Sequence, residues 1–140
     1  MFLLDTNVIS ELRKLRRADP TVAAWASATT PALMHLSVMT LMELDIGVLR
    51  IERRDQPQGA LLRRWLETKV VAQFAHRIVP IDAAIAQRCA HLHVPNPRPE
   101  RDALIAATAM MHGLTVVTRN TVDFEPMGVA VLNPWLATSA

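Results

Sequence analysis

The sequence has little cysteine, glycine and aromatic content. Cys89 is its single cysteine, so neither an intrachain disulfide nor a cysteine zinc cluster can form, and a reducing, cytoplasmic setting is expected. The four glycines are isolated, which excludes a glycine-rich phosphate loop. With three Phe, three Trp and no Tyr, the chain offers little material for stacking bases, so a nucleic acid would be held mainly through its phosphates.

Long hydrophobic runs are also missing. The longest stretch without Asp, Glu, Lys or Arg, residues 20–42, is interrupted by Pro31 and His35 and is not expected to span a membrane. The apolar start of the chain has no basic flank and meets Asp5 at once, unlike a signal peptide. No membrane association is therefore expected.

The composition that remains is apolar and slightly basic. Hydrophobic residues make up 51% of 140, which suits one compact domain over residues 1–140 and leaves apolar surface that a partner could cover. The net charge is only +2, but arginines cluster over 13–17, 50–54 and 63–64. These clusters fit an anionic ligand such as nucleic acid, or they are solvated helix faces.

Patterns of polarity and turn residues predict alternating strands and helices. The strands are expected at Phe2–Leu4, Met34–Ser37, Arg77–Pro80, Thr115–Thr118 and Ala130–Leu132. The helices are expected over about 7–15, 21–27, 40–53, 60–75, 83–91 and 100–112, with a turn at 56–59. This alternation predicts an α/β protein whose parallel sheet of about five strands is covered by helices on both faces, in three α/β/α layers.

Four acidic residues stand in or against apolar runs: Asp5, Glu43, Asp102 and Asp123. Carboxylates gathered from distant parts of a chain are typical of a divalent-cation site. Asp5 and the loop that carries Asp123 each follow a predicted strand, and parallel sheets bind ligands at the carboxyl ends of their strands.

Each acid also has a simpler structural interpretation. Asp5 can be only a helix N-cap, and Asp123 can be an ordinary turn residue. Glu43 shares a narrow helical stripe with Gly47 and Arg50, which can face solvent instead of a site. Asp102 stands in a first helical turn, where acids are favoured by the helix dipole, although its helical neighbours are small apolar residues that should pack on the sheet.

Four stretches, residues 4–10, 40–47, 101–109 and 117–124, resemble the successive motifs of PIN-domain ribonucleases. Within these, the chain most resembles the VapC-type toxins of bacterial type II toxin-antitoxin systems, in the FitB-like branch, and residues 133–135 share that likeness. The resemblance implies a PIN-domain fold, an endoribonuclease acting on RNA and inhibition by a cognate VapB/FitA-like antitoxin. It also implies a homodimer, and binding of operator DNA only through the antitoxin.

Carried over residue by residue, the resemblance implies a metal and catalytic site made of the four acids, Asp5, Glu43, Asp102 and Asp123. The pocket residues would be Thr6 and Asn7, which orient Asp5, and Thr118 and Asn120, which bond the pocket or a substrate phosphate. Many family members have Asp where this chain has Asn120. One firmly held Mg²⁺, or Mn²⁺ in its place, is therefore expected, unless Asp123 supplies the charge for a second ion.

Hard carboxylate oxygens suit Mg²⁺, which keeps several waters and takes further ligands from substrate phosphate. Such an ion activates a water for attack on a phosphodiester, with Asp5 and Asp102 as ligands. Glu43 would bind the ion through water or help to deprotonate the attacking water. The carboxylates alone would suit DNA equally, so RNA comes from the resemblance.

Three other interpretations fit the sequence less well. A signalling receiver domain also uses an acidic Mg²⁺ pocket, but it has an early acidic pair and a late Lys, whereas here Arg119 is the only basic residue after the Thr115–Thr118 strand. A non-catalytic binding module would keep the fold without needing all four acids. His91 and His93 could bind a metal, yet they lie where a helix meets a proline-rich connector, with no third ligand near.

Overall fold

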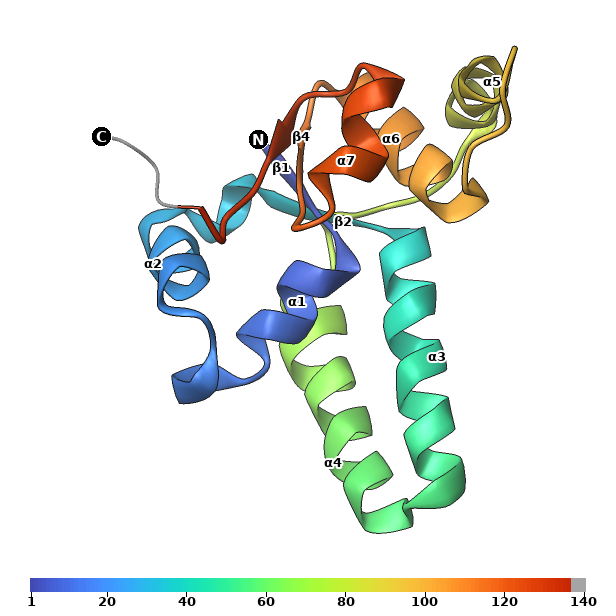
Figure 1. The fold of residues 1–140 in the computed structure, drawn as a ribbon. Coiled ribbons are helices and arrows are strands. Elements are labelled where there is room, and N and C mark those ends of the chain that lie inside the picture. Colours follow the sequence, from blue (N-terminus) through green and yellow to red (C-terminus); the bar gives the residue numbers. More distant parts are fainter. Residues whose placement is uncertain (137–140) are drawn as a thin grey trace.

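The computed structural model describes residues 1–136 and contains one sheet of five parallel strands (Figure 1). In chain order the strands are β1 (Phe2–Leu4), β2 (Met34–Ser37), β3 (Ile78–Val79), β4 (Thr115–Val117) and β5 (Val131–Leu132). Their order across the sheet is β3-β2-β1-β4-β5. The chain therefore builds outward from β1 to one edge, then crosses back to add β4 and β5 on the other side. The expected parallel sheet is confirmed, and residues 137–140 of the expected 1–140 domain lie outside the described residues.

Seven α-helices connect the strands within residues 1–136. They are α1 (Thr6–Leu12), α2 (Pro20–Ala28), α3 (Val38–Arg54), α4 (Gln56–Trp65), α5 (Ala83–Leu92), α6 (Glu100–His112) and α7 (Thr121–Phe124). Short 3-10 segments lie at Leu15–Arg17, Pro31–Leu33 and Glu125–Met127, and a π-helical segment at Leu66–Val71. Across the described residues, the helices are all too short or too polar to cross a membrane.

Alternate side chains of the strands enter two separate cores. Leu3 and Val116 face one side of the sheet and pack against residues of α5, α6 and α7. Leu4 and Val117 face the other side and pack against residues of α1, α3 and the segment after α4. Figure 1 shows these two groups of helices on opposite sides of the strands. The sheet is therefore covered on both faces, as the three-layer prediction required.

Several predicted helix boundaries need correction, and the helix expected over 60–75 is α4 and the π-helical segment, which together run from Gln56 to Val71. The helix expected over 7–15 ends at Leu12, because Leu15 adopts a positive φ of 54° that an α-helix cannot accommodate. The helix expected from residue 40 begins at Val38, because the Ser37 hydroxyl caps it by accepting a hydrogen bond from the Met39 amide at 3.0 Å. The helix over 100–112 is confirmed, and Gly113 ends it in the left-handed conformation.

The turn predicted at 56–59 is wrong, because these residues form the first turn of α4. The Asp55 side chain caps this helix by accepting a hydrogen bond from the Gln58 amide at 3.2 Å. Pro57 lies in the first helical turn, where a missing amide hydrogen removes no intrahelical bond. Proline and glycine favour a turn in general, but their position just after a capping Asp favours the start of a helix.

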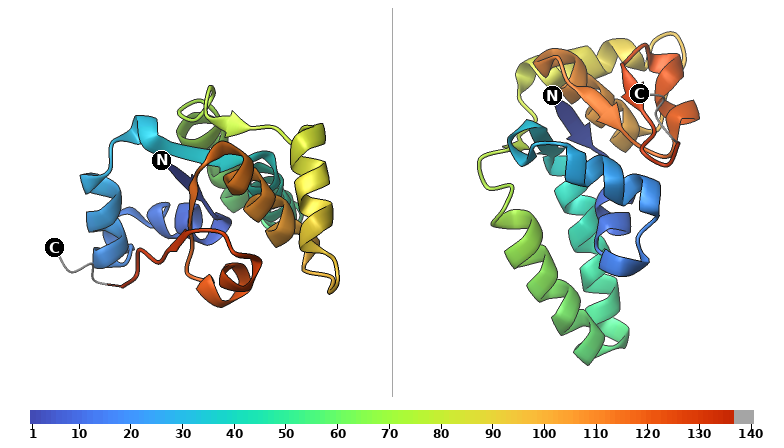
Figure 2. Two further views of the ribbon diagram at one scale, coloured as in Figure 1. Left: turned by 90° about the horizontal axis from the view of Figure 1, so that it is seen from above. Right: turned by 90° about the vertical axis from the view of Figure 1, so that its left-hand side faces the viewer.

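Helices α3 and α4 form an antiparallel pair that projects from the body of the molecule (Figures 1 and 2). Arg63 of α4 ties the pair together through contacts to Asp45 at 2.8 Å and Glu52 at 2.9 Å, both on α3. Gly59 is buried against α3, and a Cβ atom there would overlap the backbone of Glu52. This pairing fixes α3, which carries Glu43.

A Gly59→Ala substitution should destabilise the protein by about 1–3 kcal/mol, because the added methyl group forces α3 and α4 apart. The matched control is Gly47→Ala, since a Cβ at Gly47 would meet no atom within 4 Å. That change should be neutral or should stabilise the protein by up to about 1 kcal/mol through helix propensity. Urea denaturation of both variants measures the difference. Equal stability of the two variants would contradict the close packing of α3 and α4.

Candidate active site

The carboxyl ends of β1 and β4 lie side by side and bring Asp5 and Thr118 together. Leu4 is in register with Val117, and the Asp5 amide donates a hydrogen bond to the Val117 carbonyl at 2.9 Å. The Thr118 hydroxyl then donates to Asp5 Oδ2 at 2.8 Å. This is the place where the strand order reverses, at which open α/β sheets bind ligands.

Asp5 is 6% exposed, and hydrogen-bond donors surround its carboxylate. Its Oδ1 atom accepts from the Thr6 amide at 2.8 Å, which caps α1. Its Oδ2 atom accepts from Thr118 and from Asn7 Nδ2, the latter at 3.3 Å. Burial is the largest influence on the pKa of Asp5 and raises it, while these donors oppose the shift. Asp5 is therefore an N-cap and also a member of a polar cluster.

Asn7 and Thr118 connect the start of α1 to the loop after β4. Asn7 Nδ2 also donates to the Thr118 hydroxyl at 3.2 Å, and Asn7 Oδ1 accepts from the Arg119 amide at 3.2 Å. The Asn120 amide donates to the same hydroxyl at 3.0 Å. The pocket residues Thr6, Asn7, Thr118 and Asn120 thus form one network around Asp5, in which Asn120 contributes its backbone and leaves its side chain exposed.

Glu43 reaches this cluster from α3. Its Oε1 atom accepts a hydrogen bond from the Thr6 hydroxyl at 3.2 Å. Burial raises the pKa of Glu43, and the nearby Asp5 charge adds to the rise. Gly47 and Arg50 on the same stripe are exposed, and so are Met42 and Leu49 on one flank of it, so α3 is not mostly buried around Glu43. Glu43 occupies the end of a solvent-facing stripe, where that stripe meets the acidic cluster.

Asp102, in the first turn of α6, is linked to the other acids by charge. Burial and then the charges of Asp5, Asp123 and Glu43 raise its pKa to about 6. Asp123 lies on α7, where its amide donates to the Asn120 carbonyl at 3.1 Å, and its side chain is exposed. Its charge also raises the pKa of Asp5. The structure therefore brings the four predicted acids together, with Asp123 at the exposed edge.

A sequence profile described as the PIN domain matches residues 2–127. The chain belongs to the PIN-domain family. It is 36% identical to VapC ribonuclease Y4jK of Sinorhizobium fredii over 96% of this chain and 98% of that protein. It is 38% identical to Toxin FitB of Neisseria gonorrhoeae over 96% of this chain and 99% of that protein. A chain in the structure of FitAB bound to IR36 DNA fragment superposes with a TM-score of 0.90, at 33% identity and 99% coverage of both chains.

The donor set of this PIN domain fits a hard cation that keeps most of its water. All four charged groups offer carboxylate oxygen, and each of Asp5, Glu43 and Asp102 has a raised pKa that a nearby cation would lower again. Among residues 1–136, no three His, Cys, Asp or Glu side chains are arranged to hold one ion together. Mg²⁺ needs only one or two carboxylates beside its waters, so the arrangement suits Mg²⁺ better than zinc.

The histidine pair is not part of this cluster. The His93 Nδ1 atom accepts a hydrogen bond from the Arg98 amide at 3.1 Å, which holds the connector after α5. His91 is exposed at the end of the same helix. The contact to Arg98 gives His93 a structural role.

Two basic residues beside the cluster were not predicted. The Arg101 guanidinium lies 4.0 Å from the Glu43 carboxylate and lowers the pKa of Glu43 against the effect of burial. Arg119 follows Thr118 and stacks over Trp135 at 5.1 Å from the ring centroid. Each is adjacent in sequence to a predicted site residue, and this adjacency is the only feature of the sequence that points to a place beside the site.

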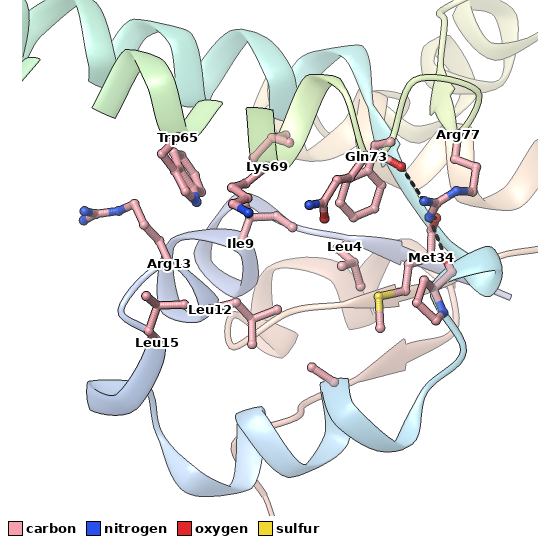
Figure 3. A pocket seen from close by; sticks show the side chains of 14 residues that line it. Leu4, Ile9, Leu12, Arg13, Leu15, Met34, Trp65, Lys69, Gln73 and Arg77 are labelled. Carbon is pink, nitrogen blue, oxygen red and sulfur yellow. Dashed lines mark hydrogen bonds between the residues drawn. The ribbon is translucent and has the colours of Figure 1, made fainter. Parts of the chain in front are cut away.

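An apolar groove of about 410 Å³ lies between α1, α2 and the α4 segment (Figure 3). Leu12, Met34 and Phe74 are among its lining residues, and Lys69 and Arg77 add positive charge. The apolar lining suits a hydrophobic ligand or polypeptide segment.

The crowding of the acids predicts a pH-dependent stability. Because the folded pKa of Asp102, about 6, exceeds its ordinary value of 3.8, this carboxyl group stabilises the fold while protonated, and that stabilisation is lost as pH rises from about 4 to 6. Asp102→Asn should therefore raise the free energy of unfolding by about 1–2 kcal/mol at pH 7.5 in the presence of a chelator. This is less than the full pKa shift of Asp102 implies, because the side chain is partly exposed to solvent.

Thermal or urea unfolding at pH 4 and pH 7.5 measures this effect. Asp102→Asn should gain stability at pH 7.5 and change little at pH 4. Glu67→Gln, which removes an exposed carboxylate after α4, is the control for a general loss of charge. An equal gain in both variants, or a gain at pH 4 only, would contradict the crowding of Asp102.

Proposed function

We propose that this PIN domain is the toxin of a bacterial type II toxin-antitoxin system and acts as a Mg²⁺-dependent endoribonuclease. The observation that carries the proposal is the cluster of four carboxylates at the reversal point of the sheet. The similarity to proteins named VapC ribonuclease and Toxin FitB supports it. Because carboxylates suit DNA and RNA equally, RNA as the substrate rests on that similarity.

In this proposal Asp5 and Asp102 hold the ion, Mn²⁺ can replace Mg²⁺, and Asp123 adds charge at the exposed edge. When bound, the ion supplies a Lewis acid that activates a water for attack on the phosphodiester and offsets charge on the leaving oxygen. The donors from Thr6, Asn7 and Thr118 hold the Asp5 carboxylate in one orientation.

Glu43 is the proposed acceptor for a proton of the attacking water, or an outer ligand through water. Its raised pKa makes it a better proton acceptor at neutral pH than an ordinary glutamate, and the Thr6 hydroxyl fixes one of its oxygens. Asn120 would contact the pocket or a substrate phosphate. Because Asn120 is uncharged, a single firmly held ion is proposed, and Asp123 is the residue that could support a second.

Removal of the proposed ligands tests catalysis. Asp5→Asn and Asp102→Asn should each abolish Mg²⁺-dependent RNA cleavage and relieve growth arrest on expression, while the fold is retained. Glu43→Gln should lower the cleavage rate by about 10²–10⁴-fold if Glu43 accepts the proton. Rates on a labelled oligoribonucleotide, measured with Mg²⁺, with Mn²⁺ and with chelator, give the result.

The matched control is Glu125→Gln, because Glu125 is an exposed acid two residues from Asp123 and is not among the charges that shift the pKa of Asp102. It should cleave at the wild-type rate. Undiminished cleavage by folded Asp5→Asn protein would exclude the metal assignment. Binding of RNA without any Mg²⁺-dependent cleavage by the wild type would favour the second candidate, a non-catalytic binding module.

Inhibition by a cognate VapB/FitA-like antitoxin is the other part of the proposal. The apolar groove offers a place for an apolar antitoxin segment, and the similarity to the FitAB complex on DNA supports such a partner. A basic side chain of this segment would enter among Asp5, Glu43 and Asp102, where Arg101 already places a guanidinium 4.0 Å from Glu43. Operator DNA would be bound only through the antitoxin, and the toxin would form a homodimer.

An antitoxin truncated to its apolar segment should therefore still bind and inhibit. Mutating its basic residue to Ala should restore cleavage more than it weakens association, because the charge competes with the cation while the apolar contacts supply affinity. Calorimetric titration together with the cleavage assay separates the two effects. Inhibition by the DNA-binding half of the antitoxin alone would contradict the groove assignment.

A further inference from the structure

A second groove, of about 490 Å³, begins at the acidic cluster and runs between α1 and the α3–α4 pair. Thr6 and Glu43 line it at the cluster. Arg50 and Arg54 line it further along α3, and Arg13 lines it from the end of α1. The groove therefore has a negative end and a positive end.

The spacing of residues on α3 gives the groove its direction. Glu43, Gly47, Arg50 and Arg54 are separated by four, three and four positions, which places them on one helical face. The eleven-residue step from Glu43 to Arg54 corresponds to about 16 Å along the helix axis. Gly47 leaves open space between the two ends, since a Cβ there would meet no atom within 4 Å. This length and opening suit an extended chain better than a single small molecule.

The charges of the three arginines that line this groove are not neutralised by carboxylates of the described residues. Within residues 1–136, the guanidinium groups of Arg13, Arg50 and Arg54 form no ion pair and no hydrogen bond, whereas Arg63 on α4 is fully engaged by α3 carboxylates. Arg13 lies over the Trp65 ring at 5.8 Å from its centroid, and Figure 3 shows both side chains at one end of the apolar groove, which Arg13 also lines. Stacking fixes a guanidinium while leaving its N–H edges available for an anion.

We propose that this groove binds the RNA strand next to the scissile phosphate, with Arg13, Arg50 and Arg54 contacting successive backbone phosphates. The inference rests on the proposed ribonuclease function. Phosphate oxygens match the paired N–H donors of arginine, and Leu62 and Trp65 provide an apolar wall against which bases can lie. A basic inhibitory segment would be repelled by these arginines, which favours RNA over such a segment as the occupant.

The test compares two triple variants with the same change in charge. Arg13→Gln/Arg50→Gln/Arg54→Gln removes the groove arginines. Arg16→Gln/Arg53→Gln/Arg64→Gln removes exposed arginines that lie in the same part of the chain and line neither groove. Fluorescence anisotropy with a single-stranded oligoribonucleotide, in the Asp5→Asn background so that the RNA stays intact, gives Kd over a range of salt concentrations.

The groove variant should bind about tenfold or more weakly, and its slope of log K against log salt should be smaller by about 2, because about 0.7 is lost for each phosphate contact to a single strand. The charge-matched control should stay within about twofold of the parent. Equal weakening in both variants would overturn the proposal, and so would a groove variant that loses affinity for the antitoxin but not for RNA.

The outcomes also separate this inference from the proposed activity. Groove-dependent RNA binding by a wild-type protein that never cleaves would refute the nuclease and retain the groove. Wild-type cleavage with unchanged KM in the groove variant would refute the groove and retain the nuclease. If removal of Arg13 disturbs Trp65, the double variant Arg50→Gln/Arg54→Gln still tests the proposal, with an expected slope change of about 1.4.

Discussion

The hydrogen bond from the Thr118 hydroxyl to the buried Asp5 carboxylate is the contact on which the rest of the site depends. A carboxylate at 6% exposure needs donors, and this one takes them from the start of α1 and from the loop after β4. The same donors fix where α1 begins and how the loop leaves the sheet. The most buried charge in the cluster is therefore also the point at which two distant parts of the chain are joined.

Around this contact the molecule holds more negative charge than its fold alone would favour. Burial and mutual repulsion raise the pKa values of Asp5, Glu43 and Asp102 together, so each ionised acid makes ionisation of the others less favourable. A divalent cation and an incoming basic side chain would relieve the same repulsion. In the proposed mechanism, the cation needed for activity and the basic side chain that inhibits neutralise the same acidic cluster. The stability of the free protein is lower because neither is bound.

The α3–α4 pair connects this cluster to the surface that a ligand would meet. Arg63 and the close approach at Gly59 hold the two helices in a fixed relation. One face of α3 thereby carries Glu43 into the cluster and Arg50 and Arg54 along the neighbouring groove. Arg13 and Trp65 line both this groove and the apolar one, so the two sites share a wall.

The sequence by itself determined the strands, most helices and the identity of the four acids. Strand alternation, capping residues and the motif around each acid are local properties, and parallel strands necessarily bring Asp5 and the loop after β4 to one edge. Local signals also misled at Pro57 and Gly59, because proline and glycine occur both in turns and in the first turn of a helix. Only the Asp55 cap and the packing of Gly59 on Glu52 show that these residues begin a helix.

Only the tertiary structure decided how the acids share their charge and where the grooves lie. From the sequence alone, Asp123 remained a possible turn residue and Glu43 a possible surface residue. The influence of one charge on another depends on the distance between them in space, and these acids lie on elements that are far apart in the sequence. Arg13 belongs to one arginine cluster of the chain, and Arg50 and Arg54 belong to another. The packing of α1 against α3 and α4 is what places all three along one groove that begins at the acids.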